Sequence, residues 1–136
     1  MRTLAPPDPK LWLSRAEWFW RAHDLNAGPQ PLDLNARASL LLAELEAVFC
    51  AGAWASVVIV AWALVETEER AAARAAAARG EEPRPEPDAD WLRERRNALV
   101  HSEPWREEVP DETALETMAQ GAVRVAFKTL FAAGWR

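Results

Sequence analysis

AVFCAGAWASVVIVAWALV, residues 47–65, is a run of nineteen residues without a charge, and its interpretation decides the fold. As one helix, the run would be long enough to span a membrane. Many of its residues are alanine, however, and Gly52 near its start is of the residue type that most often ends a helix. The flanks are acidic, with Glu44 before the run and Glu66 after it, and lack a clear basic anchor. We therefore expect two core helices joined at Gly52 and no membrane association, with a membrane span as the alternative.

Helical spacing of apolar residues continues on both sides of this run. Capping residues and prolines place the boundaries of the helices. We expect a first helix at about 9–24, capped by Asp8, and a second from an N-cap at Asp33 or Asn35 to the turn at Gly52. A third should cover about 54–79, and a fourth should run from Asp88 or Asp90 to His101. The last should begin at Pro110 or Asp111, with Gly121 marking a close helix approach. No alternation typical of β-strands and no internal repeat are visible. The sequence therefore predicts an all-α, up-and-down helical bundle.

The composition limits the size and the cellular location of the protein. At 136 residues the chain has room for one domain, and half of its residues are hydrophobic, with eight Trp among them. Cys50 is the single cysteine, so no intrachain disulfide can form, and we expect a cytoplasmic location. The first residues, which include Pro6, Pro7 and Pro9, lack the apolar core of a signal peptide.

The charge balance restricts how nucleic acid could bind. A formal net charge of −5 argues against a broad electrostatic surface for nucleic acid. Any contact with RNA must then be local, and the candidate cluster is Arg93, Arg95, Arg96 and Arg106. No group of Cys, His and Asp has metal-ligand spacing, and no glycine-rich phosphate loop is present. We therefore expect neither a metal ion nor a cofactor.

The run WLRERRNALVH, residues 91–101, carries the candidate chemistry. It places Arg96, Asn97 and His101 within six residues. Arginine holds phosphate through a planar, permanently charged fork, and histidine can both take and give a proton near neutral pH. Together they suit cleavage of a phosphodiester. The simpler interpretation is that an Arg and a His at this spacing recur by chance in helices. We expect the other histidine, His23, to be a packing or surface residue.

Helical geometry predicts how this run is oriented. At about 100° per residue, Trp91, Leu92, Ala98 and Leu99 share one arc, which we expect to face the core; Arg93, Arg96, Asn97 and His101 share the opposite arc. Pro104 disfavours helix at the residue before it, so His101 should lie in the last turn. Arg96 and His101 are about 140° apart around one helix. Two copies related by a two-fold axis would present them to one phosphate better than one copy.

At these residues the chain resembles the HEPN domains, all-α bundles of which many are metal-independent ribonucleases. Their motif is an Arg, four to six residues and then a His, commonly with a small polar residue after the Arg, and Arg96, Asn97 and His101 occupy those places. The resemblance extends to the order of helices over roughly residues 33–135. It implies a HEPN-type bundle at residues 33–136, preceded by an extra N-terminal helix and Pro-rich connector at residues 1–32.

The resemblance also implies an activity and partners. The implied activity is metal-independent RNA cleavage by a toxin or defence component, with a homodimer placing the active site at its interface. His101 would move protons, Arg96 would stabilise charge on the phosphoryl oxygens, and Asn97 would position one of them. Implied partners are a second copy, RNA and an antitoxin of the nucleotidyltransferase type. Some relatives carry a tyrosine two places after the His as a target of that antitoxin; here the place holds Glu103, and the chain has no Tyr.

Two further residues are candidates for a supporting role. Glu66 is the first charge after the apolar run and could orient Arg96 or His101, although an ion pair with Arg70 four residues later is the simpler interpretation. Arg93 is four residues before Asn97 and could assist on the polar arc.

A second class of function stays open from the sequence alone. The same helical domain could act without catalysis, as a module that binds a protein partner or a nucleotide. The acidic net charge and the lack of an extended basic groove favour this alternative, whereas Arg96, Asn97 and His101 favour an endoribonuclease.

Overall fold

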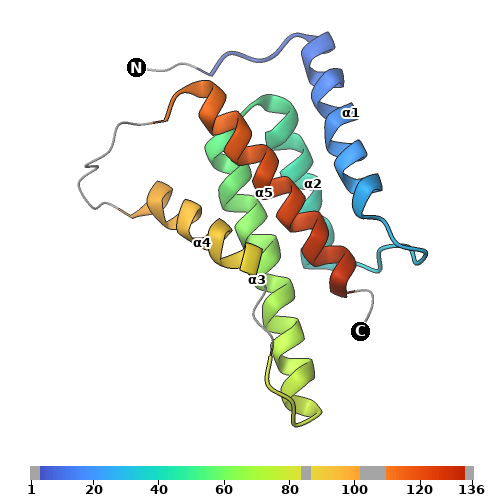
Figure 1. Cartoon of the computed structure of the whole chain (residues 1–136). Coiled ribbons are helices and arrows are strands. Elements are labelled where there is room, and N and C mark those ends of the chain that lie inside the picture. Colours follow the sequence, from blue (N-terminus) through green and yellow to red (C-terminus); the bar gives the residue numbers. More distant parts are fainter. Residues whose placement is uncertain (1–3, 84–86, 102–109, 134–136) are drawn as a thin grey trace.

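The computed structural model describes residues 4–83, 87–101 and 110–133. These residues form five helices and no strand: α1 (Pro9–Asn26), α2 (Ala36–Ala51), α3 (Trp54–Ala78), α4 (Pro87–Val100) and α5 (Glu112–Ala133) (Figure 1). The predicted all-α fold is therefore confirmed.

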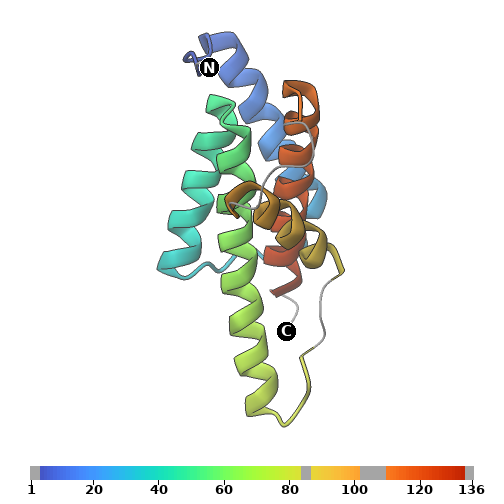
Figure 2. The ribbon, with the colours of Figure 1, turned by 90° about the vertical axis from the view of Figure 1, so that its left-hand side faces the viewer.

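The helices follow an up-and-down order only in part. α1, α2 and α3 alternate in direction, and α5 packs against α3 with the same direction as α3 (Figure 1). α4 instead lies across α3, in front of the bundle in Figure 2, and the second half of α3 extends beyond the other helices. The crossing of α4 leaves its C-terminal end at the side of the bundle.

Short polar side chains fix the starts of three helices. Asp8 accepts a hydrogen bond from the backbone N–H of Leu11 at 2.9 Å, with a proline in the first turn of α1. Asn35, one of the two predicted caps of α2, accepts from Ala38 at 2.9 Å. Asp111 accepts from Ala114 at 2.8 Å ahead of α5. Each bond satisfies a backbone donor that has no partner within its own helix, so these starts were readable from the sequence.

Gly52 separates α2 from α3 and so divides the uncharged run 47–65. Its φ of 73° is in the left-handed region, which favours glycine. The N–H groups of Gly52 and Ala53 both return to carbonyls of the last turn of α2, which closes that helix. Two core helices joined at Gly52 are therefore confirmed, and no described helix is long and apolar enough to cross a membrane.

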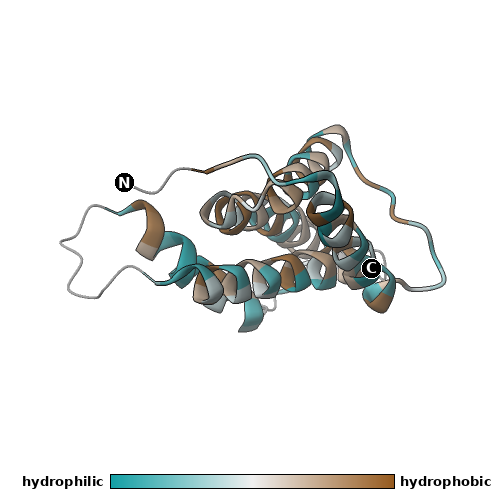
Figure 3. Ribbon diagram, turned by 90° about the horizontal axis from the view of Figure 1, so that it is seen from above, coloured by the Kyte–Doolittle hydropathy of each residue, from teal (hydrophilic) through white to brown (hydrophobic). Residues whose placement is uncertain are grey.

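The hydrophobic core lies between α1, α2, α3 and α5, and α4 adds Leu92 to it. Its largest fully buried side chains are Phe19, Leu45, Phe49, Val57, Val58, Leu64, Val65, Leu92, Val123 and Phe127. Burying each of these stabilises the fold by roughly 1.5–3 kcal/mol before entropy is counted. Figure 3, seen from above, shows apolar residues in all of these helices. Because Phe19 of α1 belongs to this core, α1 packs as part of the bundle; the predicted boundary at residue 32 stays a prediction.

Candidate functional site

α4 carries the candidate site, and two side chains hold it on the bundle. Leu92 is fully buried where α4 crosses the core. The ring of Trp91 lies against Gly121 of α5 so closely that a Cβ there would stand 2.9 Å from Cη2 of the indole. The predicted close helix approach at Gly121 is therefore confirmed.

The face that α4 turns inward differs from the predicted one at two residues. Arg96 is half-buried and Ala98 is exposed, so placing Ala98 on the core face and Arg96 on the opposite arc was wrong. The inward stripe runs through Ala89, Leu92, Arg96 and Leu99, at spacings of three and four residues. The way in which α4 crosses α3 decides which side of α4 faces the core. Rotating α4 about its own axis by a few tens of degrees is enough to change which of residues 96 and 98 lies nearer the core.

Arg96 is held by a neutral side chain. Its Nη1 donates a hydrogen bond of 2.9 Å to Oδ1 of Asn97. The two neighbouring arginines of α4 are engaged differently: Arg93 forms an ion pair with Asp90 at 2.8 Å, and the guanidinium of Arg95 lies 5.8 Å from the ring centre of Trp91. Among the described residues no carboxylate pairs with Arg96. Its guanidinium can therefore still bind an anion.

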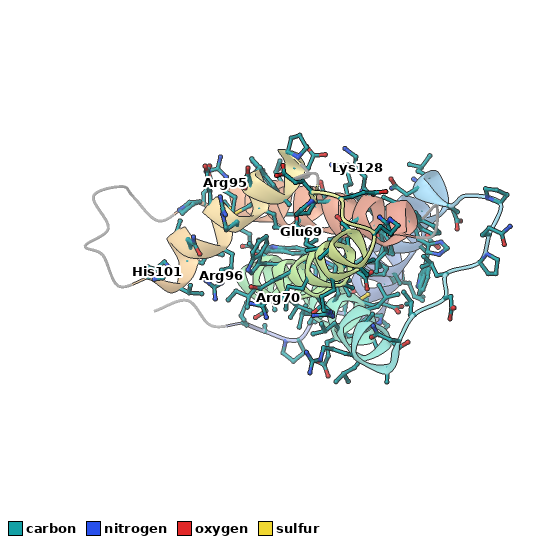
Figure 4. The ribbon with its side chains drawn as sticks, turned by 90° about the horizontal axis from the view of Figure 1, so that it is seen from below. Glu69, Arg70, Arg95, Arg96, His101 and Lys128 are labelled. Carbon is teal, nitrogen blue, oxygen red and sulfur yellow. The ribbon has the colours of Figure 1, made fainter. Side chains whose placement is uncertain are left out.

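His101 is the first residue after α4. Its N–H donates to the carbonyl oxygen of Asn97 at 3.0 Å, which continues the helical pattern, so the predicted place at the end of the helix holds to within one residue. The side chain is exposed (Figure 4). Val100 beside it is 43% exposed and adds one apolar side chain to the polar end of α4. No hydrogen bond among the described residues joins His101 to Arg96.

The two supporting candidates are both engaged in local ion pairs. Oε1 of Glu66 lies 2.8 Å from Nη2 of Arg70, as the simpler interpretation predicts. Arg93 is paired with Asp90 one turn earlier. A supporting role for either residue stays a prediction. Glu103 and Arg106 lie outside the described residues.

His23 belongs to an aromatic cluster, and its expected packing role is confirmed. Its ring centre lies 5.4 Å from that of Phe127 and 5.1 Å from that of Phe131. Its Nδ1 and Oδ1 of Asp24 are 2.9 Å apart. Trp20 contacts the same ring from α1, at 5.2 Å. The ring therefore fills the seam between α1 and α5.

Arg15 is a structural residue that the sequence did not reveal. Its guanidinium covers Gly52, donates to the carbonyl oxygen of Cys50 at 3.1 Å and lies 4.8 Å from the ring centre of Trp54. Burial raises the pKa of the Cys50 thiol above its ordinary 9.0, Glu46 adds to this effect, and Arg15 opposes it. Near this turn, Gly52 was the only residue from which the sequence predicted a turn. The contact with Arg15 was not predicted, because Arg15 belongs to α1.

Within ranges 4–83, 87–101 and 110–133, no group of three or more His, Cys, Asp or Glu side chains is placed to hold a metal ion. The expectation of neither metal nor cofactor stays a prediction.

The chain matches no protein-family model, and no curated protein or solved structure was found to match it.

Proposed function

We propose that this protein is a HEPN-like, metal-independent endoribonuclease that works as a homodimer. In this proposal the bundle is of the HEPN type, and the active site combines Arg96 and Asn97 of one copy with His101 of the other. The biological setting we propose is a cytoplasmic toxin or defence component.

The observation that carries the proposal is the state of Arg96. A half-buried guanidinium is usually neutralised by a carboxylate, because leaving it unpaired costs free energy. Among the described residues Arg96 instead donates a hydrogen bond only to the neutral amide oxygen of Asn97. That arrangement fixes the guanidinium and leaves donors for a phosphate. It also changes the role of Asn97, whose oxygen holds Arg96 while its NH₂ group can donate to a phosphoryl oxygen.

The separation of Arg96 and His101 supports a site shared between two copies. The two side chains leave α4 about 140° apart, one half-buried and the other exposed. The exposed Val100 adds one apolar side chain to the end of α4, and apolar side chains are typical of the centre of a protein interface. A second copy packed there would bring its own His101 toward the Arg96 of the first.

The chemistry follows from these groups. His101 takes the proton of the RNA 2′-hydroxyl, and the resulting oxygen attacks the adjacent phosphorus. Arg96 stabilises the charge that develops on the phosphoryl oxygens. The protonated His101 gives its proton to the 5′-oxygen as that oxygen leaves, so the products end in a 2′,3′-cyclic phosphate and a 5′-hydroxyl. DNA lacks the 2′-hydroxyl and is not cleaved by this route.

The test is cleavage of single-stranded RNA by the purified protein in excess chelator. Arg96→Ala and His101→Ala should each lower the rate by about a hundredfold or more, and Arg96→Lys should not restore it, because an ammonium lacks the two-point contact. Asn97→Ala, which releases Arg96, should lower the rate by about tenfold.

The matched control is Arg37→Ala, which removes one exposed charge from α2 and should cleave at the wild-type rate. Circular dichroism should show the same helicity for all variants. Abolition of wild-type cleavage by chelator alone would contradict the proposed mechanism.

A specific observation favours the second class of function. Leu11, Trp12 and Leu13 at the start of α1 are 42%, 40% and 62% exposed, and adjoining apolar side chains of this kind are found at protein-binding surfaces. If wild-type protein cleaves no RNA and the folded Arg96 and His101 variants still bind a protein partner, the non-catalytic module is the better account.

A further inference from the structure

A small depression lies at the other end of α4 from the candidate active site. Its volume is about 190 Å³, and it is lined by Ala22, Leu25, Asn26, Asp88, Arg124, Val125 and Lys128. These residues come from the end of α1, the first turn of α4 and the second half of α5. At 1.5 Å per residue, Asp88 and Val100 are about 18 Å apart along α4. The depression is therefore separate from Arg96 and His101.

The lining combines an apolar floor with charged sides. Ala22 and Val125 are buried core residues at 5% and 8% exposure, whereas Leu25 is 81% exposed and stands at the edge. The two cations are Arg124 and Lys128, and the single carboxylate is that of Asp88. An apolar floor with a few charged groups is the usual composition of a small-ligand site.

The two cations of the depression differ in whether a carboxylate pairs with them. Nζ of Lys128 lies 2.5 Å from Oδ2 of Asp88, so that pair is formally neutral (Lys128 is labelled in Figure 4). The guanidinium of Arg124 lies 5.1 Å from the ring centre of Trp18, and no carboxylate among the described residues pairs with it. Trp18 is itself stacked on Phe49, with ring centres 5.0 Å apart. Arg124 is therefore supported on a fixed aromatic ring and carries the excess positive charge of the depression.

We propose that this depression binds a small organic monoanion, with its apolar body on Ala22, Leu25 and Val125 and its anionic group on Arg124. The volume corresponds to on the order of six water molecules, which suits a compact carboxylate. Asp88 competes with the ligand for Lys128, so it weakens binding.

Titration with benzoate, followed by the backbone amide signals of the ¹⁵N-labelled protein, tests the proposal. Benzoate should shift the amides of Ala22, Leu25 and Val125 in a saturable manner. Benzyl alcohol has the same ring without the charge and should bind about tenfold more weakly, because the charge-assisted hydrogen bond to Arg124 is lost.

One variant should lower the benzoate affinity. Arg124→Ala removes the guanidinium and should lower the affinity by about tenfold. Arg21→Ala is the matched control: it removes an exposed charge from α1 outside the depression and should leave the affinity unchanged.

Three results would overturn the proposal: no saturable shift at these amides, equal binding of benzoate and benzyl alcohol, or equal losses from Arg124→Ala and Arg21→Ala. Circular dichroism of each variant establishes that it is folded. RNA cleavage is measured separately, so failure of this site leaves the proposed ribonuclease activity unaffected.

Discussion

The two histidines of this chain occupy opposite surroundings. His23 lies at the seam of α1 and α5, with its ring against Phe127 and Phe131 and its Nδ1 beside Asp24. His101 follows the last residue of α4 with an exposed side chain, next to the half-exposed Val100. One imidazole is a packing element, and the other is accessible to a substrate.

This difference shows how far the local sequence can distinguish the roles of the two histidines. Both histidines lie on or at the end of helices that carry aromatic and aliphatic residues. The rings that surround His23 include two from α5, more than a hundred residues later in the chain. A proton-transfer role needs access to substrate, so the exposure of His101 is compatible with the chemistry that we propose for it, whereas the neighbours of His23 give that ring a packing role.

The largest stability effect is expected where α4, which carries His101, is attached to α5. Gly121→Val places side-chain atoms where the Trp91 ring lies and should lower the free energy of unfolding by about 2 kcal/mol through overpacking. Urea denaturation measures the effect. Trp91→Ala in the same chain should remove most of this extra cost, and Thr117→Val on the exposed side of α5 is the control. An unchanged midpoint for Gly121→Val would show that Trp91 does not pack there.

An intermediate effect should separate the two histidines directly. His23→Ala removes a ring from an aromatic cluster and should cost about 1–2 kcal/mol of stability. His101→Ala removes an exposed side chain and should change stability by no more than about 0.5 kcal/mol. The same urea denaturation compares them, and equal costs would remove the basis for assigning them different roles.

The smallest effect concerns Cys50, which is buried in the last turn of α2, where Arg15 of α1 donates to its carbonyl oxygen. Because burial raises the pKa of this thiol in the folded protein, its contribution to stability is full below the ordinary pKa of 9.0 and is lost as the pH rises through the folded-state pKa. Relative to Cys50→Ala, the wild-type protein should lose stability above about pH 9 and show a constant difference from pH 6 to 8. Thermal melting of both proteins across this range measures the difference. A constant difference up to pH 10 would contradict the raised pKa.

Much of the fold was predictable because its signals are local. Asp8, Asn35 and Asp111 cap helices within three residues of themselves, and Gly52 ends α2 through its own φ. The single glycine in the last helix, Gly121, indicated a close approach, although not its partner Trp91. Such features depend on a few neighbouring residues, and the sequence displays them directly.

The rest depended on long-range contacts. Which face of α4 turns inward is decided by its crossing of α3, and this left Arg96 half-buried and Ala98 exposed, against the expectation from periodicity. α4 has polar residues on most of its sides, so its weak apolar pattern did not determine the rotation. Arg15 covers Gly52 and Trp54 and so joins α1 to the α2–α3 turn. No local sequence pattern predicts this contact.

The most direct test of the central claim, an active site shared by two copies, is a mixing experiment. Arg96→Ala and His101→Ala proteins are each inactive in the proposed mechanism. Mixing them in equal amounts, with unfolding and refolding together, forms mixed dimers in about half of the population, each with one intact site of two. RNA cleavage should then recover to about a quarter of the wild-type rate. If the mixture stays as inactive as either variant while light scattering shows dimers, Arg96 and His101 do not act across an interface and the account is contradicted.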